Sequence, residues 1–219
     1  MNSQLAWLQN NLAWIGELTV SHLYLSIIPV IIGLAIALPI GWLAHRYRAV
    51  LPVIVAGSSL LYTIPSLAFF VLMPVIIGTK ILDPLNVVIA LTVYTIALLV
   101  RVVADGLGSV PEEAVQAATG MGYTPVQRLL RVQLPVAVPV IGAGLRVAVV
   151  ANVSVVSMAA LIGIPQLGSL FTYGLQVFQM LPVIIGILLS AVLALGLDLL
   201  VQGSIRGLTP WNRRMRGAS

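Results

Sequence analysis

The chain has 219 residues, of which 60% are apolar and only 8% are charged, and its mean hydropathy is +1.09. A soluble domain is about 45–50% apolar and about 25% charged. A water-soluble fold could not hide this much apolar surface, and a disordered chain of this composition would collapse. The composition therefore predicts an integral membrane protein. The net charge of +5 is no nucleic-acid signal, because most basic residues flank apolar segments, where they indicate membrane orientation.

Several kinds of chemical site are excluded by residue content. The absence of cysteine rules out disulfides, thiolate metal sites and cysteine nucleophiles, and His22 and His45 are too few for a histidine-rich metal site. No GxxxxGK[ST] phosphate-binding loop is present, and Lys80 is the only lysine. Glu112 and Glu113 are neighbours on one predicted helix, so they do not face one another. We therefore predict a protein that is not an enzyme, binds no cofactor and contacts no nucleic acid.

The first residues are expected to form a helix at the membrane surface. Leu5, Leu8, Leu12 and Ile15 recur at helical spacing, and no basic region precedes an apolar stretch. This pattern favours an amphipathic interfacial helix over residues 1–17 and argues against a cleaved signal peptide.

Five apolar segments follow, each long enough to cross the roughly 30 Å hydrocarbon core of a bilayer. The predicted spans lie near 19–44, 52–78, 84–101, 136–161 and 181–203. Pro65 and Pro74 interrupt the second, which is expected to be a broken helix or a helix with a re-entrant piece. Gly163, Pro165 and Gly168 are expected to place an irregular section between the last two spans, within 163–180.

The basic residues orient these spans. With the N-terminus outside and the C-terminus inside, the inner side carries Arg46, Arg48, Arg101, Arg128, Arg131, Arg206, Arg213, Arg214 and Arg216. The positive-inside rule favours this five-span arrangement over a six-span one. The transmembrane part is then 18–203, and 204–219 is a basic cytoplasmic tail with Trp211 as an interface anchor.

Four polar residues lie in or near the predicted spans. Arg146 is expected either to serve the translocation path or its gate, or to pair with carbonyls or a neighbouring subunit. Asn152 is expected to form a hydrogen bond between helices. Asp198 is assigned to snorkelling or capping at the inner end of the last span, and His22 to the outer membrane interface.

Residues 102–134 form the one long polar stretch between spans, and this topology places them in the cytoplasm. Ser109–Glu112 and Thr124–Gln127 each have the sequence of a capping box with an internal proline, which predicts two helix starts. Gly120 and Gly122 suit a helix end and a sharp turn between them. We expect a preformed helix–turn–helix that ends at Leu134–Pro135, either a plain connector or a device that transmits force from a partner.

The loop resembles the EAA loop of ABC importer permeases, whose pattern is Glu-Ala-Ala, three residues, Gly, nine residues, Ile, any residue, Leu-Pro. Gln116, Ala117, Ala118, Gly122, Val132, Leu134 and Pro135 occupy the patterned positions here. Gln116 replaces the family's Glu, and Val132 replaces Ile. The resemblance implies that this loop docks on a cytoplasmic ATPase, with Glu112 and Glu113 available to supply the charge that Gln116 lacks.

Beyond the loop, the resemblance covers roughly 18–203 and is greatest to permeases for glycine betaine, carnitine and choline. It is carried by His22–Leu23, Ala37–Gly41, Thr63–Ala68, Gly120–Gly122 and Ala159–Gly163 with Leu167–Gly168. It implies a type I ABC importer permease fold in the bacterial inner membrane. The implied partners are a second permease subunit, identical or paralogous, an ATPase dimer that binds ATP and magnesium, and an external substrate-binding protein.

Three alternatives stay open. Permeases for methionine or other amino acids share the size, the five spans and the EAA loop. An ATP-independent secondary transporter or channel is a second possibility, and a membrane-embedded enzyme a third. For a quaternary ammonium cargo, cation–π contact with aromatic side chains is expected along the pathway, and Tyr62 and Tyr94 are candidates.

Overall fold

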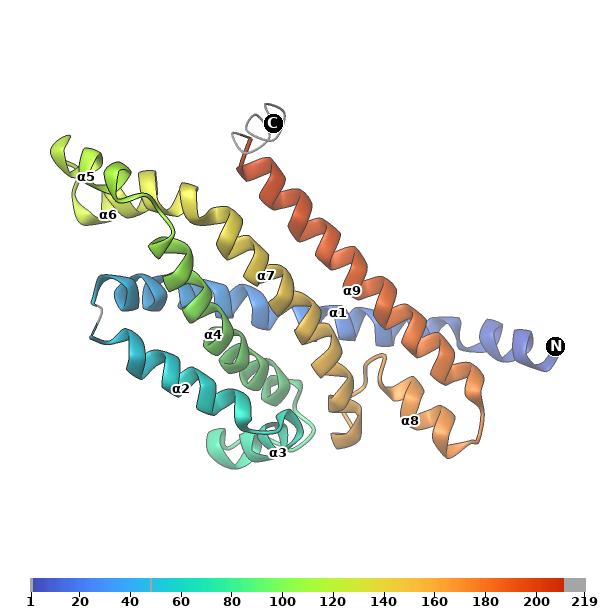
Figure 1. The fold of residues 1–219 in the computed structure, drawn as a ribbon. Coiled ribbons are helices and arrows are strands. Elements are labelled where there is room, and N and C mark those ends of the chain that lie inside the picture. Colours follow the sequence, from blue (N-terminus) through green and yellow to red (C-terminus); the bar gives the residue numbers. More distant parts are fainter. Residues whose placement is uncertain (1, 48, 211–219) are drawn as a thin grey trace.

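The computed structural model describes residues 2–47 and 49–210 of the chain. Side chains are not described for Asn2, Ser3, Leu5 and Tyr62. All regular elements in the described ranges are helical (Figure 1). Within these ranges, four helices are long and apolar enough to cross a membrane, and a bent pair of shorter helices can form a fifth span. This confirms the all-α membrane architecture with about five spans.

The longest helix, α1 (Asn2–Arg46), packs most extensively on α4 (Pro84–Gly108), which lies at the centre of the bundle (Figure 1). Gly33, Ala37 and Gly41 recur every four residues and let the two backbones approach closely. A Cβ atom on Gly33 would lie 2.6 Å from Thr95 Cγ2. The segment 1–17, expected at the membrane surface, is continuous with the first span over the described residues, because α1 has no break there.

The second apolar segment is a broken helix, as its prolines predict. Helix α2 (Leu51–Thr63) and helix α3 (Ser66–Ile77) meet at an angle of 100°. Pro65 lies at the corner, where it has no N–H to continue α2. Helix α3 therefore crosses the end of the bundle that is remote from α5 (Figure 1).

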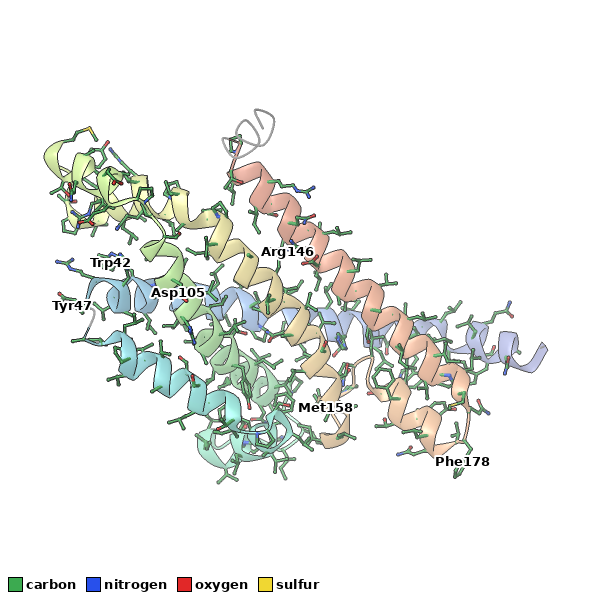
Figure 2. All side chains as sticks on the ribbon, in the orientation of Figure 1. Trp42, Tyr47, Asp105, Arg146, Met158 and Phe178 are labelled. Atoms are coloured by element: carbon green, nitrogen blue, oxygen red, sulfur yellow. The ribbon has the colours of Figure 1, made fainter. Side chains whose placement is uncertain are left out.

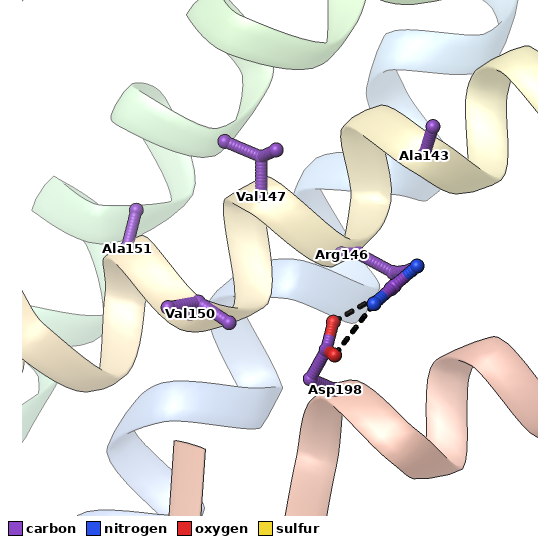
Figure 3. Close-up of a pocket in the computed structure, with 6 residues that line it drawn as sticks. All are labelled: Ala143, Arg146, Val147, Val150, Ala151 and Asp198. Atoms are coloured by element: carbon purple, nitrogen blue, oxygen red, sulfur yellow. Dashed lines mark hydrogen bonds and ion pairs between the residues drawn. The ribbon is translucent and has the colours of Figure 1, made fainter. Parts of the chain in front are cut away.

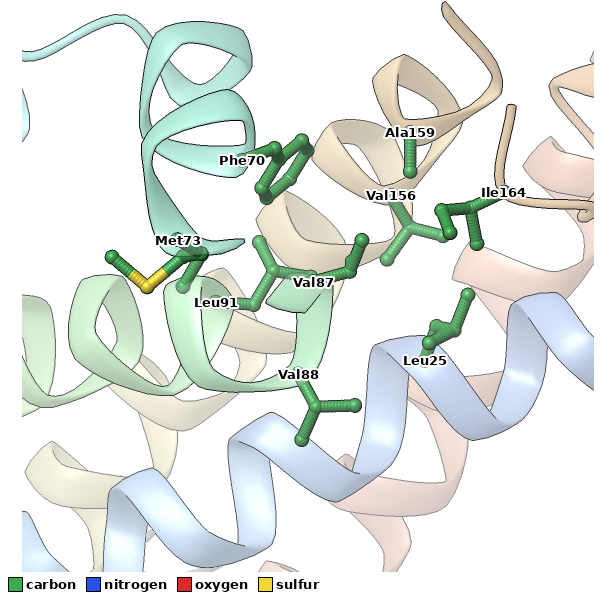
Figure 4. Close-up of a cluster of buried hydrophobic side chains, with 10 residues drawn as sticks. Leu25, Phe70, Met73, Val87, Val88, Leu91, Val156, Ala159 and Ile164 are labelled. Carbon is green, nitrogen blue, oxygen red and sulfur yellow. The ribbon is translucent and has the colours of Figure 1, made fainter. Parts of the chain in front are cut away.

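A buried apolar cluster fixes α3 to this end. Figure 4 shows Phe70 of α3 directed at Leu91 and Val87 of α4, beside Val156 from the end of α7 (Leu134–Val156). Phe70, Val87 and Val156 are fully buried. Because lipid is as apolar as these side chains, the cluster stabilises the corner through close van der Waals packing.

The second half of the chain folds as helices joined by tight segments. Helix α4 is followed by α5 (Glu112–Gly120) and α6 (Pro125–Arg128), and a π-helical turn (Leu129–Gln133) leads into α7. A 3-10 segment (Ser157–Ile162) ends α7, and α8 (Ser169–Gln176) precedes the last helix, α9 (Met180–Leu208). The irregular section expected within 163–180 thus contains one short helix, α8.

Aromatic side chains mark two opposite ends of the molecule. Arg46 lies over the rings of Trp42 and Tyr47, 5.7 and 5.6 Å from their centroids, at the end of α1. Phe178 is 96% exposed at the corner between α8 and α9 (Figure 2). Trp211 and the arginines after it, predicted to anchor the basic tail, lie outside the described residues.

Candidate functional site

Helices α5 and α6 project from one end of the bundle as a helical hairpin (Figure 1). The first of the two predicted capping boxes is wrong. Ser109 ends α4, with its N–H bonded to the Asp105 carbonyl, and its Oγ donates to the Gly106 carbonyl 2.7 Å away. Helix α5 begins after Pro111 without a side-chain cap. A residue before proline is disfavoured in helical conformation, so the helix starts beyond the Val110–Pro111 pair.

The turn between the two helices depends on Gly122. Its φ of +80° lies in the left-handed region, which glycine adopts without steric cost. The Gly122 N–H donates to the Thr119 carbonyl, and the Tyr123 N–H donates to the Ala118 carbonyl. These two bonds form a Schellman motif that ends α5, as the glycine spacing predicts.

The second predicted capping box is confirmed. Thr124 Oγ1 accepts a hydrogen bond from the Gln127 N–H, and Gln127 Oε1 accepts one from the Thr124 N–H at 2.9 Å. Pro125 occupies the first helical position, where its missing N–H costs nothing.

The hairpin does not end at Leu134–Pro135 as expected, because α6 runs through the π-helical turn directly into α7. The whole stretch Pro125–Ile162 behaves as one helix. The Leu134 N–H reaches back five residues to the Leu129 carbonyl. Proline clashes with the carbonyl four residues before it, and the wider π turn ahead of Pro135 accommodates the ring without breaking the helix.

A side-chain contact that the sequence did not reveal holds α5 against α6. Arg128 donates through a terminal guanidinium nitrogen to Thr119 Oγ1 at 2.7 Å, and Thr119 Oγ1 donates to the Val115 carbonyl. The two residues are nine positions apart on different helices, so no helical spacing marks them as partners. The bond makes the hairpin a stiffer unit than its turn alone would.

The residues predicted to couple this loop to an ATPase lie mostly on the open surface of α5. Glu112, Glu113, Gln116, Ala117 and Gly120 are exposed, and Ala118 is buried beneath them. Gln116 Nε2 donates to Glu112 Oε1 at 3.2 Å, which places a carboxylate beside the position where the family has glutamate. Leu134 and Pro135 are half-buried at the root of the hairpin.

In the bundle, Arg146 of α7 and Asp198 of α9 form a bidentate ion pair. Arg146 Nε and a terminal guanidinium nitrogen each donate to one carboxylate oxygen at 2.7 Å (Figure 3). The pair borders an open depression of about 530 Å³, lined also by Ala143, Val147 and Val150. Arg146 thus has a structural partner, and it is an acid of the same chain. Asp198 is neither a cap nor a snorkelling residue.

A second pocket is lined by Asn152 of α7, Tyr94 of α4 and the α2–α3 corner. Asn152 Nδ2 donates to Thr95 Oγ1 at 3.0 Å, which confirms the predicted hydrogen bond between helices. The Tyr94 hydroxyl donates to the Ile64 carbonyl at the corner. Asn152 and Tyr94 both line a cavity of about 270 Å³. The side chain of Tyr62, the other aromatic candidate, is outside the described part.

The prediction for His22 is wrong, because the ring is fully buried rather than at the interface. Its Nε2 lies 3.0 Å from the Val153 carbonyl, and its Nδ1 lies 3.0 Å from Gln166 Oε1. Gln166 is also fully buried, and it accepts from the Gly168 N–H and donates to the Ser157 carbonyl. His22 therefore fastens α1 to the end of α7 and to the segment that follows it.

Removing this ring is expected to lower stability. The variant His22→Leu removes the ring that contacts both the Val153 carbonyl and Gln166 Oε1, one of which accepts its N–H, and we expect a loss of about 1–3 kcal/mol in the free energy of unfolding. Ser154→Ala is the control, since that exposed hydroxyl bonds only to the Val150 carbonyl of its own helix. Denaturant unfolding in detergent micelles measures both variants, and equal stabilities would contradict this role for His22.

The bundle of apolar spans defines an integral membrane protein, and the family that it matches defines its class. The chain belongs to the family described as "Binding-protein-dependent transport system inner membrane component", whose model matches residues 30–209. It is therefore an ABC importer permease of the bacterial inner membrane, and proteins of this family work with an ATPase and a substrate-binding protein.

The chain is similar over nearly its whole length to permeases from two bacteria. It is 36% identical to osmoprotectant import permease protein OsmW of Salmonella typhimurium, over 93% of this chain and 96% of that one. It is 27% identical to the glycine betaine/carnitine/choline transport system permease protein OpuCB of Bacillus subtilis, over 96% and 95%.

Among solved structures, the fold is similar to that of the MetNI methionine ABC transporter in an inward-facing conformation. The TM-score is 0.80, and the match covers 90% of this chain and 97% of that one at 21% identity. This likeness confirms the type I importer permease fold and says nothing of the cargo.

Proposed function

We propose that this chain is the permease of an ATP-driven importer for quaternary-amine osmoprotectants such as glycine betaine, carnitine or choline. The observation that carries this cargo is the 36% identity to the osmoprotectant permease OsmW over 93% of the chain. Methionine or another amino acid is the competing cargo, and the 21% identity to the methionine transporter supports a shared fold without supporting a shared cargo.

The hairpin α5–α6 is proposed to be the surface that docks on the ATPase. It is compact, it is stiffened by the Schellman turn, the Thr124 cap and the Arg128–Thr119 bond, and its exposed face carries Glu112 and Gln116. Because α6 continues into α7, a displacement of the hairpin moves α7 as one body. ATP-driven closure of the ATPases would in this way tilt a helix that borders both pockets.

We infer that the hairpin end faces the cytoplasm. Arg46 ends α1 on this side, and Arg101 lies near the end of α4. The same end of the molecule carries Arg128, Arg131 and Arg206. Lys80 lies at the opposite end, between α3 and α4. A positive-inside distribution of this kind supports an outside N-terminus and an inside C-terminus.

A second permease subunit is proposed to complete the pathway. The side of α7 that carries Val140, Ala143, Val147 and Val150 is exposed. It includes the depression beside Arg146, so one chain leaves this face uncovered. A copy of this chain or a paralogue would enclose it.

Uptake by the reconstituted transporter tests the proposal. Proteoliposomes that hold the permease with its ATPase should accumulate labelled glycine betaine or choline only with ATP on the ATPase side and binding protein on the other. Labelled methionine should not accumulate. Uptake of methionine alone would support the competing cargo, and uptake by the permease driven by an ion gradient without ATPase would support a secondary transporter.

A further inference from the structure

The pocket at the α2–α3 corner is an uncharged, partly open cavity with mainly apolar walls and a few polar groups. Its volume is about 270 Å³, and its lining comes from three directions: the corner Thr63–Ser66, one side of α4, and α7. Leu91, Ala151 and Val155 give it apolar walls. Ala151 also borders the depression beside Arg146, so the two hollows are neighbours along α7.

One unused acceptor reaches this pocket from Asn152, which is only 5% exposed. Thr95 Oγ1 donates its proton to the Leu91 carbonyl, so it can only accept from Asn152. This fixes the orientation of the amide, with Nδ2 on Thr95 and Oδ1 directed elsewhere. Among the described residues, no group donates to Asn152 Oδ1.

The broken helix also leaves an unused acceptor, the carbonyl of Thr63, on a residue that lines the pocket. In a continued helix the Thr63 carbonyl would accept from the Leu67 N–H, but the 100° bend separates the two. Within the described chain, no N–H or hydroxyl donates to the Thr63 carbonyl. The carboxyl end of a helix carries a partial negative charge of about half an electron, which favours a cation.

Tyr94 supplies an aromatic wall held in place from two sides. Its hydroxyl donates to the Ile64 carbonyl, and Phe69 packs against its ring in a T-shaped contact with centroids 5.5 Å apart. A ring fixed in this way offers its negative π-system to the pocket without an entropic cost on binding.

We propose that this pocket is a transit site for the quaternary ammonium group of the cargo, with Tyr94, Asn152 Oδ1 and the Thr63 carbonyl as its contacts. The proposal rests on the proposed function. A trimethylammonium group has no N–H to donate, so a ring face and partial negative charges suit it better than a carboxylate hydrogen bond would. The nearby charge of Arg146 is neutralised by Asp198 and does not repel a cation. An uncharged lining also lets the cargo leave, as transport requires.

Substitution of the ring tests the site in the complete transporter. Tyr94→Leu should lower the maximal rate of choline and glycine betaine uptake roughly tenfold, as expected for the loss of a desolvated cation–π contact. Cargo affinity of the isolated binding protein and ATP hydrolysis without cargo should not change. Tyr94→Phe keeps the ring and removes the hydroxyl that donates to Ile64, and it should transport within about threefold of the wild type. Equal loss in both variants would assign Tyr94 a purely structural role and overturn the proposal.

A thiol probe gives an independent reading if Tyr94→Leu does not fold. The natural chain has no cysteine, so Ser66→Cys places a single thiol at the pocket. The reagent MTSET carries a trimethylammonium group itself, and choline supplied with binding protein and ATP should slow its reaction several-fold. The uncharged analogue 3,3-dimethylbutanol should not. Ser59→Cys is the control, since Ser59 lies on α2 outside this pocket, and choline should not protect it.

The two proposals fail in different ways. If choline and glycine betaine are not taken up by the wild type, the proposed function is wrong. If they are taken up while choline leaves Ser66→Cys as reactive as before, the transporter assignment stands and the transit site is wrong.

Discussion

Gly122→Val is expected to reduce ATP-driven uptake more than tenfold and to weaken association with the ATPase. A β-branched residue at φ +80° costs on the order of 1–3 kcal/mol, which is enough to unwind the turn between α5 and α6. The Cβ itself would meet nothing within 4 Å, so the effect comes from the backbone and not from a clash. Co-purification with the ATPase and uptake by proteoliposomes measure the two losses.

Gly122→Asn is the matched control, because asparagine is close to valine in size but tolerates the left-handed conformation. We expect it to retain uptake within about threefold of the wild type. If both variants were equally defective, the glycine would be needed for contact with a partner rather than for the turn. If both were active, the hairpin would not be the coupling element.

Removing one charge of the Arg146–Asp198 pair, and leaving the other, is expected to lower the amount of folded protein about fivefold. Arg146→Leu leaves the Asp198 carboxylate unpaired between two spans, and Asp198→Leu leaves the Arg146 guanidinium unpaired there. The exposed fractions of the two side chains are 35% and 18%, and an unpaired charge at membrane depth is costly. Fluorescence-detected size-exclusion chromatography of each variant measures the folded fraction.

The double variant Arg146→Leu with Asp198→Leu separates the two roles this pair could have. An apolar pair often replaces an ion pair with little loss of stability, so folding should recover. Uptake should recover with it if the pair is structural. A double variant that folds but does not transport would instead place Arg146 in the translocation path.

Much of the architecture could be predicted from the sequence because membrane burial leaves a strong local signal. The length of the apolar segments predicted the spans, and Pro65 predicted the break in the second span. The Thr124–Gln127 box and the turn at Gly122 followed from spacing rules that act within a few residues. Each of these features is decided by neighbours along the chain.

Features that depend on contact between distant segments could not be predicted in this way. Arg146 and Asp198 are 52 residues apart, and His22 and Gln166 are 144 apart. Their helices meet only in the folded bundle, so the spacing along the chain does not identify Asp198 as the partner of Arg146 or Gln166 as the partner of His22. The Ser109 box failed for a local reason, since the Val110–Pro111 pair delays the helix start.

Cross-linking from the tip of the hairpin tests the central claim, that this end of the permease contacts the ATPase. Met121 and Leu82 are 67% and 63% exposed at opposite ends of the molecule, and the natural chain has no cysteine. Met121→Cys and Leu82→Cys, each labelled with benzophenone-maleimide, are irradiated in the assembled transporter. The account predicts a cross-link to the ATPase from Met121→Cys and none from Leu82→Cys. A cross-link from Leu82→Cys alone would contradict it.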